Sequence, residues 1–157
     1  MHFSEQIQVP VSTAEAWDFI WQVQRLARCL PGCVGVAEVE TGRRYKAQFA
    51  DQIGPYKLQF ELDVDVLETK PMELVRVQAN GKDRRLGVSQ RATLLVKLRE
   101  SSPSASALDV EADIEVIGKV ATLGQFVIKR KAQDIVRQFA RNIESELRPQ
   151  VAGGAHA

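Results

Sequence analysis

The sequence predicts an α+β fold in which an antiparallel sheet of about seven strands wraps around one long C-terminal helix. Several segments alternate apolar and polar residues with a period of two, which is typical of half-buried antiparallel strands. One segment near the C-terminus, 121–147, instead has apolar residues at helical spacing. A helix-capping sequence soon after the first strand, at 12–15, predicts two short helices before the other strands.

The composition is that of one globular domain. Of the 157 residues, 45% are hydrophobic and 26% are charged, and the net charge is +1. We expect one domain over 1–148 and a flexible tail over 149–157. The balanced charge gives no reason to expect a nucleic-acid partner. No signal peptide or long apolar run is visible, so the expected location is the cytoplasm.

The N-terminal region predicts a strand followed by helices. Alternation over 3–9 predicts the first strand. Ser12 and Glu15 have the spacing of a capping box, which predicts a helix start at this point. This helix carries Trp17 and Trp21 on one side, and the helical pattern fades before the turn at 30–32.

The strongest strand signal lies in the middle of the chain. Residues 56–66 are apolar at every second position, and 45–53 show the same pattern before them. Gly54-Pro55 separates the two segments and predicts a hairpin. The remaining strands are predicted at 33–40, 73–81, 91–99 and 108–116.

The predicted last helix ends before Pro149. At 1.5 Å per residue it is about 40 Å long, so it is the one element long enough to cover the apolar face of the sheet. A twisted sheet that curls around a single helix encloses more volume than the helix fills. We therefore expect an internal pocket.

Histidine and cysteine chemistry is not expected. His2 and His156 each lie within two residues of a terminus, where chains are usually poorly ordered. Cys29 and Cys33 have a C-x3-C spacing, which differs from the C-x2-C of redox and zinc sites, so we expect two reduced thiols. No catalytic residue and no metal ligand is assigned.

Apolar residues on the inner phase of the predicted elements are candidates for binding a ligand. They are Trp21, Tyr45, Phe49, Phe60, Leu62, Leu94, Ile128 and Ile135. They could line a hydrophobic cavity, but most such residues form a packed core. Asp51 and Gln90 share the inner phase and could orient a polar ligand head. Alternatively, they lie at strand ends, where the alternation no longer applies.

The outer face of the last helix carries a second candidate site. Arg130, Arg137 and Arg141 fall opposite the apolar stripe, and Phe126 projects the same way. One interpretation is a docking patch for an acidic partner or for anionic lipid headgroups. The other is a solvated helix face with local ion pairs.

Three short motifs, in this order and spacing, resemble a known family. They are Cys29-Leu30-Pro31-Gly32-Cys33, Ile53-Gly54-Pro55, and Ile117-Gly118-Lys119-Val120-Ala121-Thr122-Leu123-Gly124. With the strand layout, the resemblance covers about 2–148 and points to the START-like (SRPBCC) helix-grip superfamily. Within it, the chain is most similar to the CoxG family of carbon monoxide dehydrogenase proteins.

The resemblance implies a non-catalytic protein that carries a quinone or lipid-like molecule in a hydrophobic cavity. It also implies a link between a molybdenum-containing hydroxylase and the electron-acceptor pool of the membrane, with peripheral contact at the inner face of the cytoplasmic membrane. No covalently bound cofactor is expected. Two alternatives remain open at this stage: a small cyclase-like or hydrolase-like enzyme acting on an apolar substrate in the same cavity, or an assembly adaptor without a ligand.

Overall fold

The computed structural model describes residues 1–148, so the predicted tail at 149–157 lies outside the described residues. Two short helices follow the first strand, and a 3-10 turn precedes the last helix. The elements are β1 (His2–Val9), α1 (Thr13–Ile20), α2 (Val23–Cys29), β2 (Cys33–Glu40), β3 (Arg44–Ile53), β4 (Tyr56–Lys70), β5 (Leu74–Asp83), β6 (Val88–Ser102), β7 (Ala105–Ile117), η1 (Lys119–Leu123) and α3 (Gln125–Leu147).

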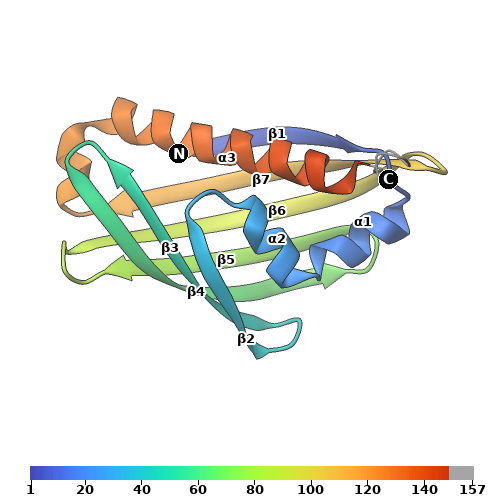
Figure 1. The fold of residues 1–157 in the computed structure, drawn as a ribbon, viewed down its shortest axis with the longest axis horizontal. Coiled ribbons are helices and arrows are strands. Elements are labelled where there is room, and N and C mark those ends of the chain that lie inside the picture. Colours follow the sequence, from blue (N-terminus) through green and yellow to red (C-terminus); the bar gives the residue numbers. More distant parts are fainter. Residues whose placement is uncertain (149–157) are drawn as a thin grey trace, which may run out of the picture.

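The seven strands form one antiparallel sheet in the order β1-β7-β6-β5-β4-β3-β2. Consecutive strands are neighbours except for β1, which pairs with β7 and so brings the two ends of the described chain together. Figure 1 shows α3 running along the sheet beside β1, while the β2, β3 and β4 strands cross at an angle to the rest. This arrangement confirms the predicted fold.

The helix starts follow from local chemistry. The Ser12 side-chain oxygen accepts a hydrogen bond from the Glu15 backbone N–H at 3.2 Å, as the capping sequence predicts. The predicted start of the last helix is too early, because 119–123 form the separate turn η1 and α3 begins at Gln125. Gly124 lies between them.

The interior divides into two apolar clusters along α3. One packs the C-terminal half of α3, through Ala140, Ile143 and Leu147, against α1, α2 and the strands β1, β6 and β7. The other joins Ile128, near the start of α3, to η1, the β3–β4 hairpin and Val88. The short helices therefore fill the sheet at one end only.

Candidate functional site

A cavity of about 240 Å³ lies between the N-terminal half of α3 and the inner face of the sheet. Its wall is apolar except for three side chains. The lining residues are Leu30, Phe49, Asp51, Ile53, Leu58, Phe60, Leu62, Ala79, Gln90, Ala92, Ile114, Val116, Val120, Ile128, Lys131, Ala132 and Ile135.

The position of the cavity follows from the unequal packing along α3. Near Ile143, the helices α1 and α2 add side chains such as Phe19 and Cys29 to the space between α3 and the sheet. Near Ile128 neither short helix belongs to the surrounding cluster. The sheet continues past this point, so part of the enclosed space stays unfilled.

The turn between α2 and β2 closes one side of the cavity. Leu30 lines it, and the Gly32 carbonyl accepts a hydrogen bond from the Ala50 backbone N–H at 2.8 Å. A Cβ atom on Gly32 would lie 2.8 Å from both the Ala50 carbonyl oxygen and a ring carbon of Phe49. This close approach holds the turn against β3, beside the aromatic wall formed by Phe49 and Phe60, whose ring centres are 6.3 Å apart.

The polar part of the wall contains an ion pair. Lys131 Nζ on α3 lies 3.0 Å from Asp51 Oδ1 on β3, and the two side chains are 36% and 25% exposed. Asp51 Oδ1 also accepts a hydrogen bond from the Gln52 backbone N–H at 2.7 Å. On the sheet, Gln90 Nε2 donates to the Ala79 carbonyl at 3.2 Å.

Sequence reasoning missed Lys131. It lies three residues after Ile128 and four before Ile135, so it belongs to the apolar stripe that faces the sheet. That spacing was the available signal, because a lysine inside an apolar stripe needs a polar partner or water. Leu30 was also missed as a lining residue, although its turn was identified.

Five predicted ligand-binding residues line the cavity together. They are Phe49, Phe60, Leu62, Ile128 and Ile135. The inward placement of Asp51 and Gln90, rather than a strand-end position, also agrees with the structure. Whether any of these residues binds a ligand stays a prediction.

The other three, Trp21, Tyr45 and Leu94, do not line this cavity, so their predicted placement in its wall is corrected. Trp21 caps the end of α1 and packs edge-on against Trp17, 5.9 Å between ring centres, at the filled end of the sheet. Leu94 also packs against the cluster at that end. Tyr45 is buried at the far end of β3, where its hydroxyl oxygen accepts a hydrogen bond from the Gly42 N–H at 2.8 Å.

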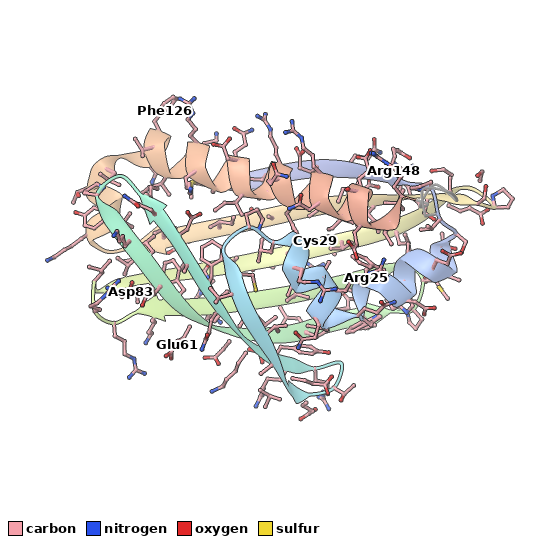
Figure 2. All side chains as sticks on the ribbon, viewed as in Figure 1. Arg25, Cys29, Glu61, Asp83, Phe126 and Arg148 are labelled. Carbon is pink, nitrogen blue, oxygen red and sulfur yellow. The ribbon has the colours of Figure 1, made fainter. Side chains whose placement is uncertain are left out.

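The predicted docking residues lie on the outer surface of α3. Phe126 is 76% exposed, and Figure 2 shows its side chain at the start of α3, pointing away from the sheet. Arg130, Arg137 and Arg141 are exposed as well. Among residues 1–148, the ion pairs that involve α3 are formed by Lys131, Glu146 and Glu144, and none includes these three arginines.

Cys29 and Cys33 are free thiols in the structure. Burial raises the pKa of both thiols, and the Glu146 carboxylate adds to the rise at Cys29. Thiols of this kind are weak nucleophiles at neutral pH. Figure 2 shows Cys29 near Arg25, whose Nε lies 2.6 Å from Glu146 Oε1 and so ties α2 to α3.

His2 corrects one premise of the sequence analysis. It is an ordered part of β1 and not a loose terminus, and its Nδ1 lies 2.8 Å from Asp113 Oδ1 on the exposed side of the sheet. No group of three or more potential metal-ligating side chains comes together within 1–148. In the same part of the chain, no helix has the length and apolar character that crossing a bilayer requires.

The family model for CoxG, a protein of carbon monoxide dehydrogenase, matches residues 6–148. The chain belongs to the CoxG family. This match confirms the family that the three sequence motifs predicted. A search of curated proteins found no match.

Solved structures confirm that the CoxG chain has a START-like fold. A conserved protein from Geobacillus kaustophilus is 22% identical with a TM-score of 0.81, and the match covers 94% of this chain and 95% of that one. A START superfamily protein from Mycobacterium smegmatis is 12% identical with a TM-score of 0.70, covering 93% and 96% of the two chains. At these identities the similarity establishes the fold alone.

Proposed function

We propose that this CoxG-family chain carries an apolar small molecule and does not catalyse a reaction. The observation that supports this function is the cavity under α3, whose wall is apolar except for Asp51, Gln90 and Lys131. Removing apolar surface from water stabilises a complex by about 25 cal/mol per Å². A preformed apolar hollow with a few polar groups is the usual form of a small-molecule site.

The cargo we propose is a quinone or a lipid-like molecule. The family name refers to carbon monoxide dehydrogenase, so the proposed partner is a molybdenum-containing hydroxylase of that kind. The carrier would link this enzyme to the electron-acceptor pool of the membrane from the cytoplasmic side. A cavity of about 240 Å³ has room for roughly eight waters at about 30 Å³ each, so it would hold a ring or a short chain, and any longer tail would extend outside.

Two observations favour carriage over the alternatives. An enzyme would need ionisable groups poised toward a substrate, and the two in this cavity wall, Asp51 and Lys131, pair with each other. An adaptor without a ligand has no use for a hollow beside α3. Of the three functions, carriage makes most use of the cavity.

The exposed side of α3 gives the carrier a proposed membrane contact. Phe126 and Val127 are exposed apolar residues next to the basic side chains of Lys129 and Arg130. An apolar residue flanked by cations suits the boundary between anionic headgroups and lipid chains. All four precede Lys131, so this surface lies at the cavity end of the helix.

Native mass spectrometry of purified protein, followed by solvent extraction, tests the proposed function. We expect an apolar molecule, released by the solvent, at close to one per chain. Delipidated protein should take up an added quinone in a one-to-one complex. Protein that purifies without any cargo and rejects added quinones and lipids would contradict carriage.

A further inference from the structure

We propose that Asp51 makes the cavity select a ligand with a neutral polar head over one with an anionic head. This inference rests on the proposed carrier function and specifies the class of ligand. It concerns the one place where the apolar wall carries charge, the contact between Asp51 on β3 and Lys131 on α3.

The ion pair is built into the wall from two separate elements. Asp51 lies between Phe49 and Ile53 on the inner face of β3, and all three residues line the cavity. Lys131 reaches the cavity from the stripe of α3 that also carries Ile128 and Ile135. A ligand head that reaches the polar part of this wall therefore meets both charges at once.

Because the two charges cancel, the wall offers no net attraction to an anion. A carboxylate head next to Lys131 would also lie beside the Asp51 carboxylate, and the two negative charges would repel each other. A hydroxyl or carbonyl head meets no such repulsion. It can accept a hydrogen bond from the ammonium group of Lys131, which has three N–H donors and uses one of them for Asp51.

Gln90 extends the same polarity on the sheet side. Its Nε2 already donates to the Ala79 carbonyl, so its remaining group at the cavity is the acceptor Oε1. An acceptor favours a neutral donor such as a hydroxyl and disfavours a carboxylate. The donor Lys131 and the acceptor Gln90 together match a small neutral head that accepts and donates hydrogen bonds.

The test compares two probes with the same chain and different heads, 1-octanol and octanoate, by isothermal titration calorimetry at pH 7.5. For the wild-type protein we expect octanol to bind at least tenfold more tightly than octanoate. The variant Asp51→Asn keeps the size of the side chain and the acceptor for the Gln52 N–H, but leaves Lys131 as an unpaired cation. It should reduce the ratio of the two affinities at least tenfold.

Two further variants bracket this result. Lys131→Met leaves Asp51 as an unpaired anion and should raise the ratio above that of the wild-type protein. Asp109→Asn removes a carboxylate from an ion pair on another part of the sheet, with Arg99 at 2.7 Å, and should leave the ratio unchanged. Circular dichroism checks that each variant is folded.

The outcomes separate the inference from the carrier function. If both probes bind but the ratio is the same in the wild-type, Asp51→Asn and Lys131→Met proteins, the cavity carries apolar molecules and the selectivity inference is wrong. If octanoate binds the wild-type protein more tightly than octanol does, the inference is wrong as well. If neither probe binds any of the folded proteins and no quinone or lipid does, the carrier function falls and the inference falls with it.

Discussion

The backbone N–H of Gln59 on β4 donates a hydrogen bond to Asp83 Oδ2 at 2.8 Å, across 24 positions of the chain. The backbone pairing of β4 with β5 stops at Glu61 and Lys82, so the Asp83 side chain continues the connection where the pairing ends. Its other oxygen accepts from the Leu86 N–H at 3.1 Å, which closes the turn before β6. Asp83 is 3% exposed, and Figure 2 shows it at the end of the sheet where β5 finishes.

The first prediction concerns Asp83 and acid stability. Burial alone would raise the pKa of Asp83, but the Gln59 and Leu86 N–H groups and the Arg85 guanidinium outweigh it and lower the pKa. The ionised form is therefore stabilised by folding above the unfolded pKa of about 3.9, and this contribution is lost as pH falls through the lower folded pKa. Asp83→Asn should reduce the free energy of unfolding at pH 7 by about 1–3 kcal/mol.

Urea unfolding at several pH values between neutral and acid measures this effect. The gap in stability between the wild-type protein and Asp83→Asn should narrow as the pH falls. Asp109→Asn is the comparison, because Arg99 also lowers the pKa of Asp109 but the carboxyl lies at the surface. A gap that stays constant down to strong acid would contradict the assigned role of the Asp83 carboxylate.

The second prediction concerns the turn that closes the cavity. Gly32 has a φ of +89° and lies against Phe49 and the Ala50 carbonyl, so Gly32→Ala adds a steric clash to the cost of a left-handed conformation. Gly42→Ala is the matched control, because Gly42 has a φ of +73° and nothing within 4 Å of an added Cβ. We expect the control to lose about 1–2 kcal/mol and Gly32→Ala clearly more, measured by thermal unfolding. Equal losses would show that the contact with Phe49 is not tight.

The sheet could be predicted from the sequence because its signal is local. Alternation identified each strand, but it placed the ends of β6 at 91 and 99, whereas the strand runs from Val88 to Ser102. Backbone hydrogen bonds continue the pairing past the last alternating side chain, as the pair Ser102 and Ala105 shows. Side-chain periodicity does not report that extension.

The cavity could be predicted only in part, because its position depends on contacts between distant elements. The inner phase of Phe49, Phe60 and Ile128 followed from periodicity, and all three line the hollow. Leu94 has the same phase but lies where α1 and α2 fill the sheet, and no local pattern says which end those helices cover. Lys131 was assigned to the charged surface because its partner, Asp51, lies 80 positions earlier in the chain.

The third prediction tests the hollow directly with one substitution at two places on α3. Ala132 lines the cavity, whereas Ala140 is buried in the packed cluster at the other half of the helix. Ala132→Leu should be tolerated with little loss of stability because its added atoms enter empty space. Ala140→Leu should cost about 1–3 kcal/mol because a packed core resists added volume.

Chemical denaturation measures the two stabilities, and native mass spectrometry measures ligand uptake. Ala132→Leu should also reduce uptake of an added quinone at least tenfold. A large destabilisation by Ala132→Leu, equal to that of Ala140→Leu, would mean that the space under α3 is already filled. Full uptake by a stable Ala132→Leu protein would place the cargo elsewhere.

The fourth prediction concerns the exposed side of α3. If the surface around Phe126 and Arg130 contacts an anionic membrane, the protein should sediment with vesicles that contain phosphatidylserine, and less so as salt is added. Phe126→Ser and Arg130→Glu should each weaken this binding about tenfold, since one removes an inserted aromatic ring and the other reverses a charge near the headgroups. Val34→Ser on β2 and Arg91→Glu on β6 change an exposed apolar residue and an exposed cation on other elements, and should leave binding unchanged. Equal losses in all four variants would point to a general effect of charge and hydrophobicity, and no binding to any vesicle would remove the membrane contact while leaving carriage to be judged on the cavity.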